Sequence, residues 1–145
     1  MSRKKARESV ILLLYHWDMN SYSSENIATT LDETVVGEVI GSETLNDDDN
    51  LYINSIIEGI QEKVESIDEA IEAETVGWKI NRLPKVDLAV LRLGIFELLY
   101  RDDIPEAVTI NECVDIAKHY STENSGTFIN GVLSTIMKKK TASGQ

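Results

Sequence analysis

The amino-acid sequence predicts an all-α domain of about seven helices. Apolar residues recur at helical spacing through most of the 145 residues, and no stretch alternates apolar and polar residues as a strand does. Two prolines and eight glycines are too few for a turn-rich sandwich or barrel. A chain of this length is expected to form one domain that buries roughly 68–70% of its unfolded surface.

The first half of the chain is expected to contain three helices. The first spans residues 4–19 and carries a wide apolar face. After "NSYSS", whose serines suit an N-cap, Ile27, Leu31 and Val35 recur every fourth position. The third helix runs from about 48 to 74 with the clearest apolar stripe, and we assign its glutamates and Asp68 to the outer face. The acids just before it favour a helix start.

The second half begins where "GWKINRLPKVD" interrupts this pattern. Residues 85–101 are apolar nearly all round, which predicts a central helix covered on most sides. The segment "DDIPEAV" indicates a stop and a restart, with Asp103 as a candidate N-cap and Pro105 in the first turn. The next helix is expected to bury Cys113, and the turn "YSTENSG" leads into a last helix whose Phe128 faces inward.

Positive charge is concentrated at one end of a strongly acidic chain. The formal net charge is -11, yet four basic residues fall within the first seven positions: Arg3, Lys4, Lys5 and Arg7, here named the basic arm. The acidity lies in residues 21–80, which hold 15 acidic and two basic side chains. Because salt screens charges beyond about 8–10 Å, a local cluster matters more to a phosphate backbone than the net charge. Charge alone leaves open a solvated tail or a nucleic-acid contact.

No group of residues typical of an active site stands out. His16 and His119 lack a metal-ligand partner one turn away, and Cys113 lies on an apolar face, where a core role is expected. The sequence has no glycine-rich phosphate loop and no nucleophile elbow. We therefore expect no enzymatic activity, no cofactor and no metal.

The apolar segments are too short for a signal peptide or a membrane span. "VILLLY" has six residues and is followed by no small-residue cleavage pattern. No segment approaches the ~20 apolar residues that a membrane helix needs. With a single cysteine, which fits a reducing compartment, the sequence predicts a soluble cytoplasmic protein.

Several long segments together resemble the NusB family of bacterial transcription antitermination factors. The opening "KKARESVILLLYHWD" is similar to that family's basic stretch and first helix. The second half carries the more specific matches, "GWKINRLPKVDLAVLRLGIFEL", "IPEAVTINECVDIAKHYS" and "SGTFINGVL". The resemblance covers residue 3 to about 137 and is weakest between 20 and 50.

The resemblance implies two small helical bundles packed together within one domain, over residues 1–75 and 76–138, with a frayed tail at 139–145. It also implies a protein without enzymatic activity. Members of the family bind boxA-type single-stranded RNA in nascent ribosomal transcripts, together with the small-subunit ribosomal protein NusE. The expected partners are therefore boxA RNA, NusE and, indirectly, the RNA polymerase elongation complex.

The family match implies an RNA-binding role for the basic arm, which can follow a single-stranded backbone. Unstacked bases also need aromatic faces, for which Tyr15, Tyr120 and Phe128 are the candidates. Asn124 and Ser125 match a helix start whose backbone N–H groups could receive a phosphate. Alternatives remain open: Phe128 for burial, and Asn124 or Ser125 for helix capping.

Other matched residues point to protein contact or packing. Asp87 and Arg92 are the candidates for binding NusE, although Arg92 could equally pair with a buried carboxylate. Gly131 is expected to let two helices approach closely.

Two other functions compete with this interpretation. One is a protein-interaction scaffold that binds through its acidic face and makes no RNA contact. The other is a domain of the kind fused to ribosomal RNA methyltransferases, which ranks far behind because these 145 residues show no α/β domain and no cofactor loop. The sequence leaves the oligomeric state open, a homodimer included.

Overall fold

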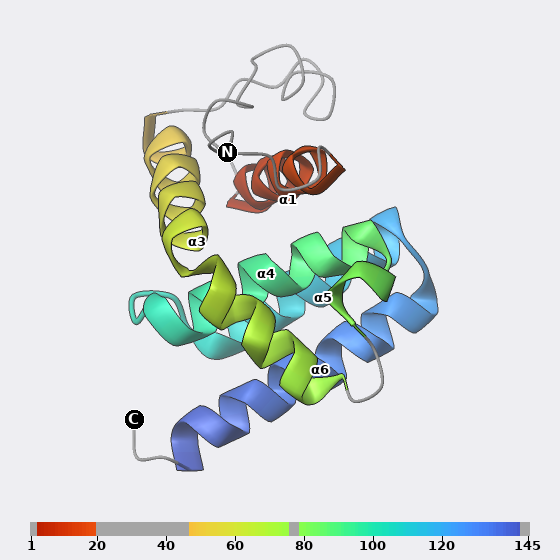
Figure 1. The fold of residues 1–145 in the computed structure, drawn as a ribbon. Coiled ribbons are helices and arrows are strands. Elements are labelled where there is room, and N and C mark those ends of the chain that lie inside the picture. The colour runs from red at the N-terminus through yellow and green to blue at the C-terminus, as the bar shows by residue number, and fades with distance from the viewer. Residues whose placement is uncertain (1–2, 20–46, 76–78, 143–145) are drawn as a thin grey trace. The chain divides into compact units, whose positions relative to one another are not determined.

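The computed structural model describes residues 3–19, 47–75 and 79–142, and all regular elements in these ranges are helical (Figure 1). They are α1 (Arg3–Met19), α3 (Asp47–Glu74), the short 3₁₀ helix η2 (Ile80–Arg82), α4 (Lys85–Tyr100), α5 (Glu106–Tyr120) and α6 (Glu123–Ala142). The all-α prediction is confirmed. The described residues form five α-helices rather than about seven, and the helix expected around residues 27–35 lies outside them.

The chain divides into two compact units, Met1–Glu62 and Lys63–Gln145. The boundary between them falls inside α3, so this helix contributes its first half to one unit and its second half to the other. The sequence-based division at residues 75 and 76 stays a prediction.

The first unit contains α1 and the first half of α3. Both helices bury their apolar stripes, with Leu13 and Leu14 of α1 and Ile56 of α3 completely inaccessible to solvent. At the start of α3 three aspartates occupy the first turn, where negative charge stabilises the helix dipole.

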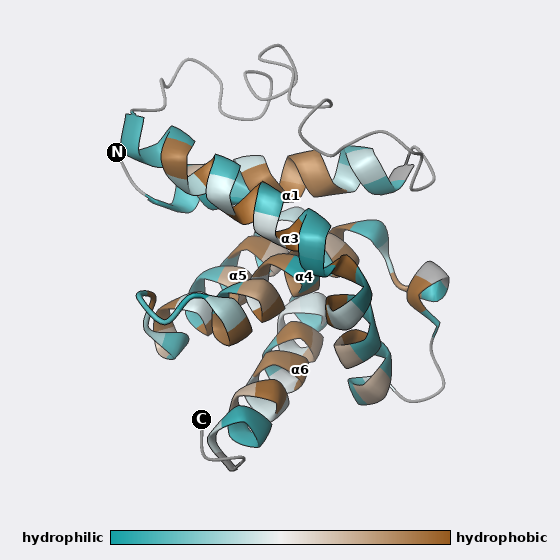
Figure 2. Cartoon of the chain, turned by 60° about the vertical axis from the view of Figure 1, so that its left-hand side comes forward, coloured by the Kyte–Doolittle hydropathy of each residue, from teal (hydrophilic) through white to brown (hydrophobic). Residues whose placement is uncertain are grey.

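Further along α3, in the second unit, the amphipathic pattern continues. Ile67 and Ile71 are fully buried, and Figure 2 shows brown hydrophobic and teal hydrophilic residues alternating along this helix. Past the helix end, the Thr75 hydroxyl donates to the Ile71 carbonyl at 2.8 Å. The Ile80 backbone N–H donates to the Glu72 carboxylate at 3.1 Å, which ties η2 to the last turns of α3.

Helix α4 is the core of the second unit. It begins directly after Pro84, and every residue from Asp87 to Leu98 is buried. Helices α5 and α6 pack against it and against each other. The central position expected for residues 85–101 is thus confirmed.

Close packing of these three helices depends on Gly94. A methyl group added there would lie 2.8 Å from Leu133 Cδ1 and 3.2 Å from Cys113 Sγ. At Gly131, by contrast, no described atom lies within 4 Å of such a methyl group. The expectation that Gly131 permits close helix approach is wrong; Gly94 has that role.

The connection between α4 and α5 also differs from the expected capping. The N-cap of α5 is Pro105, whereas the Asp103 carboxylate accepts two hydrogen bonds of 2.9 Å from Arg101. Near the end of α6, the Lys140 ammonium donates to the Leu98 carbonyl at 2.7 Å and lies 3.4 Å from the Glu106 carboxylate. This lysine therefore ties α6 to the last turn of α4 and the first turn of α5.

None of the described helices is long and apolar enough to cross a membrane.

Candidate functional site

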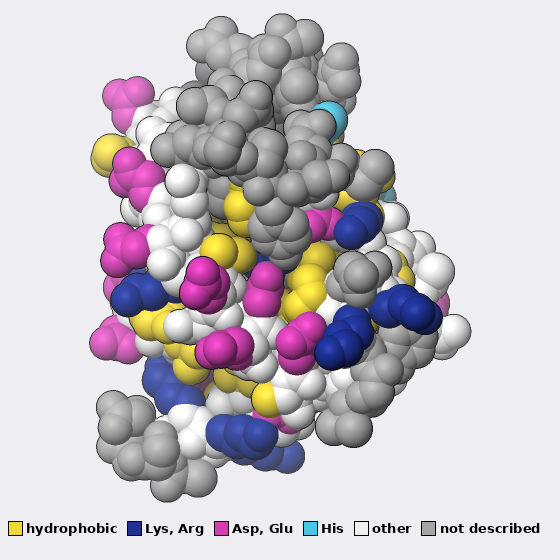
Figure 3. All heavy atoms as spheres, viewed as in Figure 1, with side chains coloured by type: hydrophobic (Ala, Val, Ile, Leu, Met, Phe, Trp, Pro, Cys, Tyr) yellow, Lys and Arg dark blue, Asp and Glu magenta, His cyan; other side chains and the backbone are white. Residues whose placement is uncertain are grey.

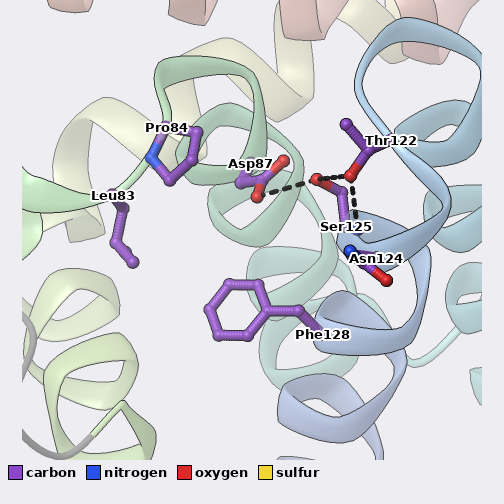
Figure 4. A pocket seen from close by; sticks show the side chains of 7 residues that line it. All are labelled: Leu83, Pro84, Asp87, Thr122, Asn124, Ser125 and Phe128. Atoms are coloured by element: carbon purple, nitrogen blue, oxygen red, sulfur yellow. Dashed lines mark hydrogen bonds between the residues drawn. The ribbon is translucent and has the colours of Figure 1, made fainter.

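A pocket of about 250 Å³ in the second unit gathers four of the residues singled out from the sequence: Asp87, Asn124, Ser125 and Phe128. Leu83, Pro84 and Thr122 complete its lining (Figure 4). The ring of Phe128 extends from α6 toward Leu83 and Pro84 and is only partly buried. The pocket therefore combines an accessible aromatic face with a polar wall.

That polar wall is a hydrogen-bond network between the start of α6 and the start of α4. Ser125 Oγ donates to Asp87 Oδ2 at 3.1 Å and accepts from Thr122 Oγ1 at 3.2 Å. The Ser125 N–H donates to Thr122 Oγ1 at 3.0 Å, which is the hydrogen bond of an N-cap. Thr122 is thus the capping residue, a role that the sequence left open for Asn124 or Ser125. Asn124 is exposed.

Asp87 is almost fully buried, with 4% of its surface exposed. Burial raises the pKa of its carboxyl above the ordinary value of 3.8, and hydrogen bonding by Ser125 and Ser121 opposes that rise. The folded protein therefore holds this proton to a higher pH than the unfolded chain does. The resulting stabilisation is present below pH 3.8 and is lost as the pH rises through the raised pKa.

An Asp87→Asn variant, neutral at every pH, should not show this loss. We expect its free energy of unfolding, relative to that of the wild type, to increase as the pH rises from 3 to 7. Urea unfolding at a series of pH values measures the difference. A difference that stays constant over this range would contradict a raised pKa.

The two remaining sequence candidates in the second unit lie outside the pocket lining. Tyr120 is 43% exposed, with its ring edge-on to His119 at a centroid distance of 4.6 Å. Arg92 is completely buried, and its Nε and Nη2 each donate to an Asp68 carboxylate oxygen at 2.9 Å. Of the two roles left open for Arg92, the structure shows the ion pair.

The basic arm forms the first turns of α1. Arg3, Lys4 and Lys5 are partly exposed, but Arg7 is only 2% exposed. The Arg3 guanidinium lies 4.4 Å from the centre of the Tyr52 ring, and its Nη2 lies 3.4 Å from Asp48 Oδ2. Tyr15, further along α1, is half-buried. The arm thus offers three accessible cations on a helix.

Three pocket residues were not found from the sequence. Leu83 and Pro84 precede α4, and Thr122 lies in the turn before α6. A threonine three residues before Ser125 is an N-cap signal, so Thr122 could have been identified. Nothing local to Leu83 and Pro84 indicates that the fold places them opposite Phe128.

Comparison with known proteins matches nearly the whole chain to one family. The model of the NusB family matches residues 4–138. The transcription antitermination protein NusB of Ruminiclostridium cellulolyticum is 44% identical over 138 residues, which are 95% of this chain and 90% of that protein.

Solved structures show the same fold. T. maritima NusB is 38% identical with a TM-score of 0.80, over 95% of this chain and 92% of that one. A chain in a crystal structure of the antitermination factors NusB and NusE in complex with double-stranded RNA is 34% identical. Its TM-score is 0.80, over 94% of this chain and 96% of that one. From the family match, the sequence identity and the shared helical fold, the chain belongs to the NusB family.

Proposed function

We propose that this protein is a non-enzymatic transcription antitermination factor of the cytoplasm. It binds boxA-type single-stranded RNA of nascent ribosomal transcripts together with ribosomal protein NusE, and acts through them on the elongating RNA polymerase. The observation that carries the proposal is the pocket lined by Phe128 and Asn124 in a chain related to a NusB that was crystallised with NusE and RNA.

The pocket suits an unstacked base better than a duplex. Single-stranded RNA is recognised through bases that stack on aromatic side chains, and Phe128 presents a partly exposed ring beside hydrogen-bonding groups of Asn124 and Ser125. The crystallised relative holds double-stranded RNA. Our choice of a single strand therefore depends on the pocket.

In this proposal the phosphates are bound by the accessible part of the basic arm. Arg3, Lys4 and Lys5 are partly exposed and are assigned to phosphate contact, whereas buried Arg7 is assigned to packing. Each phosphate contact to a single strand steepens the slope of log affinity against log salt by at most about 0.7, so three contacts set an upper limit of about 2.1 on its magnitude, against about 2.8 for four. Asp87, being buried, is assigned to positioning Ser125 rather than to direct NusE contact.

Changing Lys4 and Lys5 to Ala should weaken boxA binding and make its salt slope shallower by about 1.4, because two phosphate contacts are lost. Fluorescence anisotropy of labelled boxA RNA and of a scrambled RNA, with NusE present at two salt concentrations, measures both quantities. A variant with Lys79 and Lys138 changed to Ala is the matched control, since both residues are exposed and lie outside the arm. If the two variants had the same boxA affinity and the same salt slope, the basic arm would not contact the RNA.

One observation favours a second function, the interaction scaffold. Acidic side chains gather along α3 in Figure 3, and Glu58, Glu62, Glu65, Glu69 and Glu72 are all exposed. A scaffold using this face would show no preference for boxA over scrambled RNA. The same anisotropy experiment therefore separates the two functions.

A further inference from the structure

Arg3 makes two contacts that differ in how easily a ligand can replace them. One is with the ring of Tyr52, a residue only 3% exposed, whose ring also lies 5.7 Å from the Arg7 guanidinium. The other is with the carboxylate of Asp48, whose side chain is 80% exposed. Both contacts join the start of α1 to the start of α3.

The two contacts use different parts of the guanidinium. An aromatic ring interacts with the face of a guanidinium, and this leaves the five N–H donors at its edge available. The Asp48 carboxylate lies at that edge, 3.4 Å from Nη2. An RNA phosphate needs the same donors, so it competes with Asp48 but not with Tyr52.

The competition favours a phosphate. An exposed ion pair changes an equilibrium constant by at most about fivefold, because water and salt screen it. A phosphate can accept two parallel hydrogen bonds from arginine and carries more oxygen acceptors than the single Asp48 contact uses. Displacing Asp48 costs little, and Tyr52 keeps the guanidinium in position throughout.

We propose that Asp48 is the exchangeable counter-ion of Arg3, and that an RNA phosphate displaces it while the buried Tyr52 ring holds the guanidinium. Asp48 thereby lowers the affinity of the arm for RNA, so that weak, non-specific phosphate contacts are disfavoured. This inference rests on the proposed RNA-binding function and adds to it a residue that opposes binding.

The exchange has a consequence for salt dependence. A phosphate contact normally releases a counter-ion from the RNA and so steepens the salt slope by about 0.7 on a single strand. When the phosphate replaces Asp48, the freed carboxylate attracts a cation from solution and offsets that release. Arg3 therefore contributes little to the salt slope as long as Asp48 is present.

The test is an Asp48→Asn variant, measured by anisotropy with labelled boxA RNA and NusE. We expect binding about two- to fivefold tighter than wild type at low salt, and a salt slope steeper by up to about 0.7. Glu58→Gln is the matched control: it removes one negative charge from an exposed position ten residues further on α3, about 15 Å along the helix. The control should leave both quantities unchanged.

Arg3→Ala, measured alone and combined with Asp48→Asn, completes a double-mutant cycle of RNA affinity. If Asp48 acts through Arg3, the gain from Asp48→Asn disappears in the Arg3→Ala background. A gain that persists there, or that Glu58→Gln reproduces, overturns the inference. Selective wild-type binding with no effect of Asp48→Asn overturns the inference alone. Absence of any selectivity in the wild type overturns the proposed function and this inference together.

Discussion

An Asp68→Ala variant is expected to lose about 3–5 kcal/mol of unfolding free energy. Its carboxylate accepts both hydrogen bonds, each 2.9 Å, from Nε and Nη2 of Arg92. Arg92 is the largest of the fully buried side chains that the structure describes, so removing Asp68 takes the carboxylate that accepts these two hydrogen bonds away from a charge inside the protein. Urea unfolding followed by circular dichroism at 222 nm measures the loss.

The second unit supplies a matched control for this prediction. Arg101 and Asp103 form a pair through the same two kinds of hydrogen bond, again 2.9 Å each, but the Asp103 side chain is 64% exposed. Asp103→Ala should therefore cost less than about 1 kcal/mol. Because the geometry is the same, the difference between the two variants reports the effect of burial. Equal losses of unfolding free energy in the two variants would mean that burial does not increase the contribution of the Arg92–Asp68 pair to stability.

Gly94→Val is expected to destabilise the protein by about 1–3 kcal/mol through overpacking. The first carbon of the new side chain would lie 2.8 Å from Leu133 Cδ1 and 3.2 Å from Cys113 Sγ, and both of these residues are fully buried. The gain in helix propensity over glycine, less than about 1 kcal/mol, does not offset this clash. The unfolding free energy of the variant is measured in urea as above.

A substitution at Gly131 is expected to raise the unfolding free energy, in contrast to the substitution at Gly94. Gly131→Ala meets no described atom within 4 Å and should stabilise the protein by about 0.4–1 kcal/mol, because alanine restricts the unfolded chain and favours helix.

A Leu133→Ala change should cost less unfolding free energy in the Gly94→Val background than in wild type, since it makes room for valine. If Gly94→Val were as stable as wild type, the helices would have to separate at little cost.

The sequence was sufficient to predict the five α-helices that the structure describes, because their apolar patterns are long. Residues 85–101 have no polar face, and only a central helix can bury such a surface, which α4 does. Asp68 shows the limit of the same reasoning. Periodicity gives the direction of a side chain around its own helix, but not what the next helix presents there. Asp68 was assigned to the solvent face, and its partner Arg92 lies 24 residues away.

Only part of the candidate site could be predicted, because a sequence pattern does not show which residues of other elements lie beside a given side chain. Asn124, Ser125 and Phe128 were identified through segment resemblance, but their closeness to Leu83 and Pro84 exists only in the folded unit. Arg7 was grouped with its neighbours by charge. Its spacing of three and seven residues from Val10 and Leu14 already placed it on the buried face of α1, and the structure shows it buried.

The burial of α4 between partners on both sides of it in the chain has a consequence during synthesis. Asp68 on α3 precedes α4 and can pair with it early, but α5 and α6 follow it. From Tyr100 at the end of α4, the ribosome must add 40 residues to reach Lys140, whose ammonium binds the Leu98 carbonyl. At 5–20 residues per second this takes about 2–8 s. For those seconds α4 lacks the two helices that pack against it in the folded unit, so its apolar surface cannot yet be buried as it is in the native structure.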